Sequence, residues 1–203
     1  MPPLPSPEAL PIWAVGARRR AAGRPTHSEL ISRVREASRA EEPLIALLDA
    51  RGVLGPRHLL SAWAHLGRAR ERGQLRLRDR GAEFLLFVAG DDQLPRALSK
   101  VGIQGDTEEF VLAGEKPRAP GPLLESFGLV EAPDVYPRPA SAPLLERLGI
   151  PEGERTLVPV PQWEGLVLER VALLELSAPH PAERPGRGVR NDGRRKPAPA
   201  KSS

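Results

Sequence analysis

Cysteine is absent from this chain of 203 residues, and asparagine occurs only once, at Asn191. Without cysteine, disulfide bonds, thiolate catalysis and cysteine-based zinc sites are all excluded. No apolar run approaches the roughly 20 residues that a membrane-spanning helix needs. The first residues, "MPPLPSPEALPIW", lack the basic segment and long apolar stretch of a secretory signal. We therefore expect a soluble, cytoplasmic protein that has no contact with membranes.

The sequence also lacks the common catalytic motifs. It contains no G-x-S-x-G, G-x-x-x-x-G-K-[ST], G-x-G-x-x-G or H-E-x-x-H pattern. His58 and His65 are seven residues apart and lie on one side of a predicted helix, whereas a metal-binding pair more often has a spacing of four. Packed or surface histidines explain them better than a functional pair. We therefore expect that the protein is not an enzyme and that it has no catalytic residue, no metal and no cofactor.

Positive charge is concentrated at the end of the chain. Residues 181–203 hold seven basic and two acidic residues, a net charge of +5. Since the whole chain has a net charge of +4, residues 1–180 sum to −1. A nucleic-acid surface on the body of the protein must therefore be a local patch. The run Arg18–Arg20 is either part of such a patch or a solvated loop.

Composition divides the chain into a Pro-rich leader over residues 1–9, one domain over residues 10–178 and a basic tail over residues 179–203. The tail has almost no apolar residues to bury, so we expect it to be disordered, as we expect the leader to be flexible. Apolar segments predict strands at 9–17, 43–49 and 107–114, and periodic segments predict helices at 26–38, 55–73, 93–102, 121–129, 142–150 and 161–176. The strand–helix–strand order at the start favours two parallel strands.

Several helix ends carry local signals. Thr26 and Glu29 have the spacing of a capping box, and Pro56 and Gly73 suit the two ends of the helix between them. The segment "EFLLFVAG", residues 83–90, is ambiguous, because periodicity does not separate a short buried strand from a buried helix. "QLRLRD", residues 74–79, alternates like a short strand.

A further helix is signalled just after the ambiguous segment. Asp91 or Asp92 can cap a helix that begins at Gln93, and Gly102 can end it in the left-handed conformation.

The order of these segments resembles one known family. "PLIALLDARGVLGPRHLLSAWAHLGRARERG", then "GAEFLLFVAGDDQLPRALSKVGIQGDTEEFVLAG", then "QWEGLVLERVALLEL", is similar to the kinase-binding subunits of the KEOPS complex. The resemblance extends over about residues 10–178 and is closest over residues 44–113. It implies that residues 83–90 form a helix. The expected fold is an α/β single domain, with a small mixed sheet packed with several helices.

The resemblance implies a non-catalytic subunit of the machinery that makes threonylcarbamoyl adenosine in tRNA. Such a subunit binds the small atypical kinase of the complex directly and the other KEOPS subunits indirectly, and helps to recruit tRNA by its 3′ CCA end. Two other functions stay open: a free-standing RNA-binding protein and an unrecognised α/β enzyme. The family has no counterpart of the basic tail, so nothing carries over to it.

Candidate residues for the kinase interface are chosen from dense apolar segments, and candidates for tRNA contacts from basic residues on or beside the central helices. Five consecutive apolar residues are too many for one face of one helix, and the second faces of the helices at 57–72 and 163–176 are further candidates. The candidates for the kinase interface are Phe84, Leu85, Leu86, Phe87, Val88, Leu60 and Leu173. The candidates for tRNA contacts are Arg57, Arg76, Arg78, Arg96 and Lys100.

Overall fold

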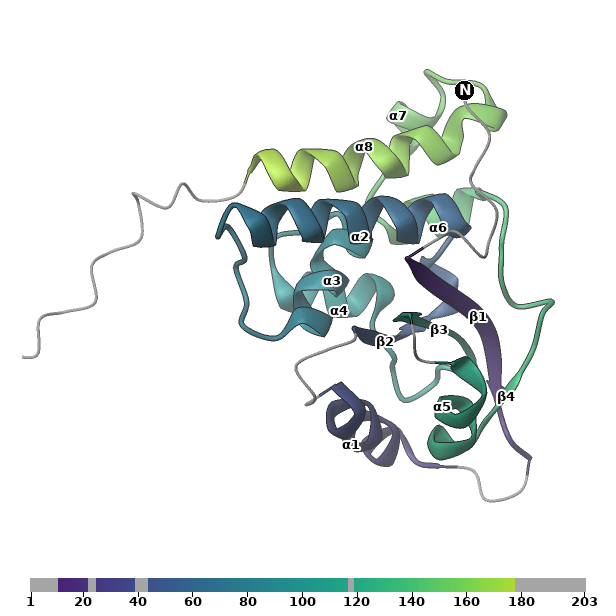
Figure 1. Ribbon diagram of the computed structural model, residues 1–203. Helices are drawn as coiled ribbons and strands as arrows, with labels where there is room; N and C mark the ends of the chain where they lie inside the picture. Colours follow the sequence, from purple (N-terminus) through teal and green to yellow (C-terminus); the bar gives the residue numbers. More distant parts are fainter. Residues whose placement is uncertain (1–10, 22–24, 39–43, 117–118, 178–203) are drawn as a thin grey trace, which may run out of the picture.

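The computed structural model describes residues 11–21, 25–38, 44–116 and 119–177, which form a single α/β domain (Figure 1). The leader, residues 1–9, and the tail, residues 179–203, lie outside the described residues. The strands are β1 (Ile12–Arg19), β2 (Ile45–Asp49), β3 (Glu109–Glu115) and β4 (Leu129–Glu131). The α-helices are α1 (His27–Ser38), α2 (Pro56–Glu71), α3 (Arg80–Ala89), α4 (Leu94–Val101), α5 (Pro120–Phe127), α6 (Ala142–Arg147), α7 (Glu152–Arg155) and α8 (Trp163–Leu176). Short 3₁₀ helices occur at Ala50–Gly52 and Val160–Gln162.

The sheet has the strand order β2-β3-β1-β4, and every neighbouring pair is antiparallel. The expected mixed sheet is therefore wrong in its pairing. β1 and β2 do run in the same direction, as the strand–helix–strand order predicted, but β3 lies between them and pairs with both. β3 takes the central position because Phe110, Val111 and Leu112 are apolar on both faces of the strand and are fully buried.

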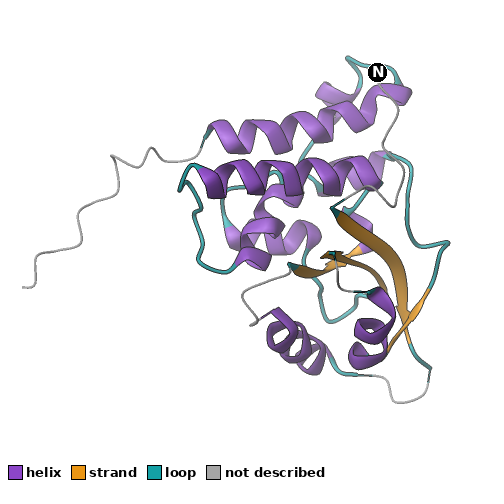
Figure 2. Ribbon diagram, viewed as in Figure 1, coloured by secondary structure: helices purple, strands orange, loops and turns teal. Residues whose placement is uncertain are grey.

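Helices cover both faces of the sheet. One core cluster, which contains Leu47 and Phe110, packs against α1 and α5. The other contains Leu48 and Val111 and packs against α2, α3, α4 and α8. Adjacent strand residues thus point to opposite cores, as the two-residue period of a strand requires. Figures 1 and 2 show α1 and α5 on one side of the sheet and α2, α3, α4 and α8 on the opposite side.

Residues 83–90 form helix α3 up to Ala89, so the implication of the family resemblance is confirmed here. The Asp79 side chain accepts a hydrogen bond from the Ala82 amide at 2.8 Å, which caps the helix. Gly90 ends it in the left-handed conformation, with φ of 58°. α3 packs between α2, α4, α8 and the sheet, so it is apolar around most of its circumference.

Most of the local helix signals act as predicted. The Glu29 amide donates to the Thr26 hydroxyl at 3.2 Å, and the Thr26 amide donates to the Glu29 carboxylate at 2.7 Å, so the capping box is confirmed. Gly73 has φ of 65° after α2. The capping prediction for α4 is wrong: Asp91 accepts a hydrogen bond from the Gln93 amide at 3.0 Å, but Gln93 is itself the N-cap residue, and no side chain caps the helix that begins at Leu94.

Two further local predictions are wrong. Gly102 is extended, with φ of −72°, because it forms an isolated antiparallel bridge with Leu48. Residues 74–79 form no strand. The amides of Arg76 and Leu77 instead donate to the buried carboxylate of Glu83, at 3.1 and 2.8 Å, which replaces the pairing that a strand would supply.

The longest helix in the part of the chain that the structure describes is α2, with 16 residues. None of the helices there combines the length and the apolarity needed to cross a bilayer.

Candidate interaction surfaces

Helix α3 buries most of the five consecutive apolar residues, 84–88, in the core. Phe84, Leu86, Phe87 and Val88 are at most 1% exposed, and they pack in the cluster on the α2 side of the sheet. The prediction that these four residues contact the kinase is therefore wrong, because a buried side chain has no accessible surface for a partner to bind. Leu85 is the exception, since it is only partly buried.

Helix α8 is apolar on two opposite sides. Its inner side packs through Val167, Val171 and Leu174, which are all buried. Its outer side carries Leu173 and Leu176 in the last turns, with 48% and 80% of their surface exposed. A surface helix normally has polar residues opposite its core-facing stripe, so this second apolar side is unusual.

The segment before α8 extends the same apolar character. Leu157 and Val160 are 81% and 60% exposed. These two residues precede the N-terminal end of α8, whereas Leu173 and Leu176 lie near its C-terminal end, so we call only Leu173 and Leu176 the α8 surface. Leu60, the candidate on α2, is partly buried and packs against the core, so it contributes less surface than Leu173.

Glu175 fastens α8 to α2. Its carboxylate accepts hydrogen bonds from Arg68 at 3.1 Å and from Arg72 at 2.7 Å, and it pairs with His65. Burial alone would raise the pKa of Glu175, but the hydrogen bonds from His65 and Arg68 outweigh it and hold that pKa below its usual range. The sequence analysis missed this interaction of α8 with α2, although His65, Arg68 and Arg72 are spaced three and four residues apart and so share one face of α2.

The five basic candidates lie in separate places. Arg96 and Lys100 both bond to Asp91 beside α4, at 2.9 and 3.0 Å. Arg57 lies 3.9 Å from Glu164, across the start of α2 and α8. The structure does not bring these three residues together into one patch.

The remaining two candidates lie in the loop between α2 and α3. Arg76 is mostly buried and donates to the Leu174 carbonyl oxygen at 2.6 Å, so it serves as a structural contact. Arg78 is exposed and has no ion-pair or hydrogen-bond partner among the described residues.

A denser arginine cluster lies elsewhere. Arg51, Arg138 and Arg147 line a pocket of 410 Å³ together with residues of the loop before α6. Each guanidinium also pairs with a carboxylate: Arg51 and Arg147 with Asp49, and Arg138 with Glu109. The sequence analysis missed this cluster, because the three arginines come from segments far apart in the chain.

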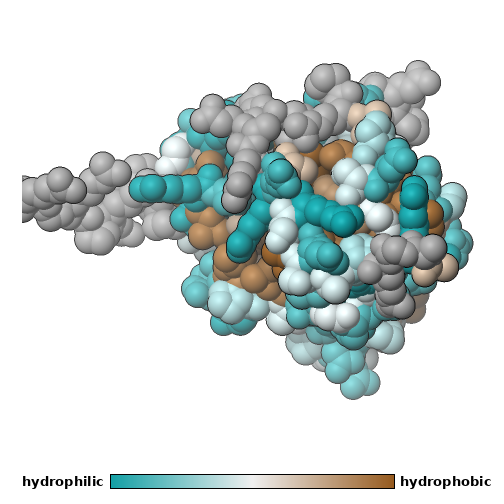
Figure 3. Space-filling view, turned by 90° about the horizontal axis from the view of Figure 1, so that it is seen from below, coloured by the Kyte–Doolittle hydropathy of each residue, from teal (hydrophilic) through white to brown (hydrophobic). Residues whose placement is uncertain are grey.

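An apolar groove of 380 Å³ runs between α1, edge strand β2, α3 and α4. Ile31, Val34, Leu94, Leu98 and Ile103 line it, and so does Leu85, the partly buried residue of α3. Seen from the α1 and α5 side, apolar residues show as brown patches among hydrophilic ones (Figure 3). No segment of the described residues fills this groove.

His58 has a structural role. Its ring is fully buried, with Nε2 2.8 Å from the Val88 carbonyl oxygen, and burial lowers its pKa to about 4. Its interpretation as a packed histidine is confirmed. Within residues 11–21, 25–38, 44–116 and 119–177, no group of three His, Asp or Glu side chains is arranged to hold a metal ion.

Comparison with known proteins found no protein-family model and no curated sequence that matches this chain.

Proposed function

We propose that the protein is a non-catalytic binding subunit of a KEOPS-type tRNA-modifying complex and that it docks the small atypical kinase through the α8 surface. The observation that carries the proposal is the second apolar side of α8. Leu173 and Leu176 leave 48% and 80% of their surface in water while the opposite side of the same helix is buried. Exposed apolar surface of this kind marks contact sites for other proteins.

The rigidity of α8 supports this use. Glu175 joins it to α2 through Arg68 and Arg72, so its outer side keeps one position before a partner arrives. A preorganised surface loses less conformational entropy on binding than a mobile one. The ordered set of segments that resembles the KEOPS kinase-binding family adds the identity of the partner to the proposal.

The proposal includes a tRNA contact that depends on a few placed groups. Among the residues predicted to contact tRNA, Arg78 is exposed. Arg51, Arg138 and Arg147 form a cluster of guanidinium groups beside one pocket. Unpaired 3′ nucleotides are bound by stacking and base-edge hydrogen bonds as well as through phosphates. Removal of the CCA end should therefore weaken binding to protein lacking residues 181–203 far more than removal of equal charge elsewhere in the tRNA.

The kinase contact is tested by recovering partners of the tagged full-length chain from native lysate and identifying them by mass. The wild-type chain should retain the kinase subunit. Leu173→Glu and Leu176→Glu should each weaken its binding at least about tenfold, since a buried leucine anchor contributes about 2 kcal/mol or more. Val130→Glu is a matched control, because Val130 is 42% exposed on β4, away from α8.

Three results would reject the proposal. One is retention of kinase binding by both folded α8 variants. Another is ATP hydrolysis or tRNA modification by the purified chain alone, which would support an enzyme. The third is strong binding of tail-deleted protein to generic duplex RNA, which would support a free-standing RNA-binding protein.

A further inference from the structure

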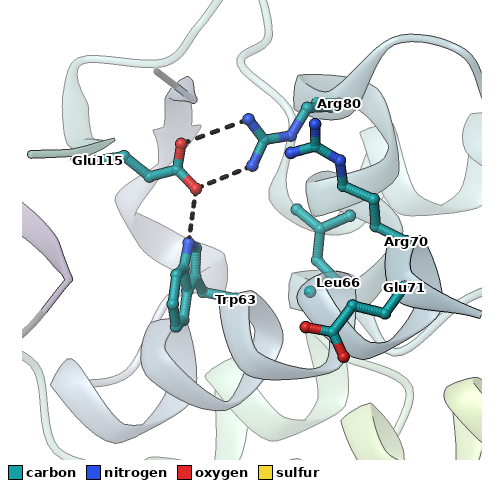
Figure 4. A pocket seen from close by; sticks show the side chains of 7 residues that line it. Trp63, Leu66, Arg70, Glu71, Arg80 and Glu115 are labelled. Atoms are coloured by element: carbon teal, nitrogen blue, oxygen red, sulfur yellow. Dashed lines mark hydrogen bonds and ion pairs between the residues drawn. The ribbon is translucent and has the colours of Figure 1, made fainter. Parts of the chain in front are cut away.

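A pocket of 490 Å³ lies beside α2 at the end of β3. It is lined by Trp63, Leu66, Gly67, Arg70, Glu71, Arg80 and Glu115 (Figure 4). Leu66 is buried, and Trp63 is only partly buried. The labelled side chains surround an open space, with the Trp63 ring on one side and Arg70 and Glu71 on the other.

The Trp63 ring is held in one orientation. Its indole N–H donates to Glu115 at 2.8 Å, and Arg80 donates to the same carboxylate at 2.8 Å. Burial would raise the pKa of Glu115, but the hydrogen bonds from the Leu44 amide, Trp63 and Arg80 outweigh it and hold that pKa below its usual range. The carboxylate therefore stays charged at neutral pH, and the ring stays fixed.

The chain before β1 leaves the sheet at this pocket. Ile12 pairs with Glu115, and the Pro11 carbonyl oxygen accepts a hydrogen bond from the Lys116 amide at 3.2 Å. Residue 10 thus continues from a point next to the residue that fixes Trp63. Residues 1–10 lie outside the described residues, and their sequence is "MPPLPSPEAL".

That sequence suits a pocket that presents a tryptophan ring. It has prolines at positions 2, 3, 5 and 7, a density that favours the extended polyproline II helix. Such segments dock on grooves lined by aromatic side chains, and they lose little entropy because their conformation is already set. At about 3.1 Å per residue, residues 2–10 reach about 28 Å, while α2 covers only about 12 Å from Trp63 to Glu71.

Gly67 lies on α2 and lines this pocket. A Cβ at this position would meet nothing within 4 Å, as at Gly121 of α5, so a side chain can be placed here without a clash. We propose that the Trp63 pocket is a binding site for a polyproline II segment, and that its occupant is the protein's own leader, residues 2–7.

The absence of cysteine allows a direct test in the full-length chain. Leu4→Cys is combined with Gly67→Cys, or with Gly121→Cys as the control. Gly121 lies in α5, six residues after Glu115, and a Cβ there also meets nothing within 4 Å. Disulfide formation in a glutathione buffer is followed by mass spectrometry of the remaining free thiols. We expect the Gly67 pair to close within one chain at least about tenfold faster than the Gly121 pair.

Two additional variants show what drives the closure. Replacing the prolines at positions 2, 3, 5 and 7 with serine leaves the domain unchanged and should lower the rate for the Gly67 pair to the control rate. Trp63→Leu should do the same, in a chain whose circular dichroism shows that it is folded. Equal rates for the two pairs, disulfide-linked dimers as the main product, or full closure without the prolines would each overturn the proposal.

Discussion

Arg147 of α6 donates a hydrogen bond to the Asp49 carboxylate at 3.1 Å, although the two residues are 98 positions apart. Asp49 ends β2 and is fully buried. It also accepts hydrogen bonds from the Arg51 amide at 2.8 Å and from the Thr107 hydroxyl at 3.0 Å. This carboxylate therefore ties the edge of the sheet to the loop before β3 and to the C-terminal half of the domain.

Asp49→Asn should lower the free energy of unfolding by about 3 kcal/mol. The change removes a buried charge to which two arginines donate, and breaking a buried pair leaves the remaining partners uncompensated. Denaturant unfolding at pH 7 measures the effect. Asp106→Asn is the control, since Asp106 also pairs with Arg51 but is exposed, and it should change stability little. Equal effects of the two substitutions would contradict the role given to Asp49.

His58 should make the protein acid-sensitive. Its pKa is about 4 in the fold, against an ordinary value of 6.5, because the buried ring resists charging. Between these values the unfolded chain binds more protons than the folded one, so stability rises with pH. The contribution is fully present above pH 6.5 and falls by about 3 kcal/mol as the pH drops to about 4. His58→Gln should flatten the stability profile between pH 6.5 and 4, and an unchanged slope would contradict this assignment.

Gly16→Ala should destabilise the fold by about 2 kcal/mol. A Cβ on Gly16 would lie 2.5 Å from the Ala132 carbonyl oxygen and 2.9 Å from the Tyr136 nitrogen, and backbone atoms cannot move aside easily. Gly165→Ala is the matched control, because a Cβ there meets nothing within 4 Å. It should stabilise α8 by about 0.5 kcal/mol. Thermal unfolding of both variants checks the opposite signs.

Glu83→Ala should loosen the loop between α2 and α3 and lower stability by about 2 kcal/mol. The buried carboxylate accepts hydrogen bonds from the amides of Arg76 and Leu77, which would lose their partner. Hydrogen exchange gives a local measurement: these two amides should exchange much faster in the variant. The Thr26 amide, which bonds to Glu29 in the α1 capping box, should be unaffected. Unchanged protection of Arg76 and Leu77 would contradict the prediction.

Deletion of residues 181–203 should leave the melting temperature nearly unchanged. Val189 is the only sizeable aliphatic residue in that segment, so it has little apolar surface to bury on the domain. A fall of many degrees would show that the tail packs against the body. If the tail contacts RNA, its deletion should also flatten the salt dependence of binding.

The sequence by itself determined much of the local structure. The Thr26 and Glu29 pair and Gly73 act within a few residues of the helix ends that they set, so their residue types and spacing were enough. Any strand places neighbours such as Phe110 and Val111 of β3 on opposite faces, which is equally a local property. The α/β class followed from the order of these segments.

Only the tertiary structure decided the rest. Whether β1 pairs with β2 or leaves room for β3 depends on contacts between residues about 100 positions apart, such as Ile12 and Glu115. The same holds for burial: Phe84 and Leu85 are neighbours of similar apolarity, yet the core cluster buries the first and the groove leaves the second partly open. Periodicity predicts which residues share an apolar face of a helix, but only the elements packed around the helix determine which apolar face remains exposed.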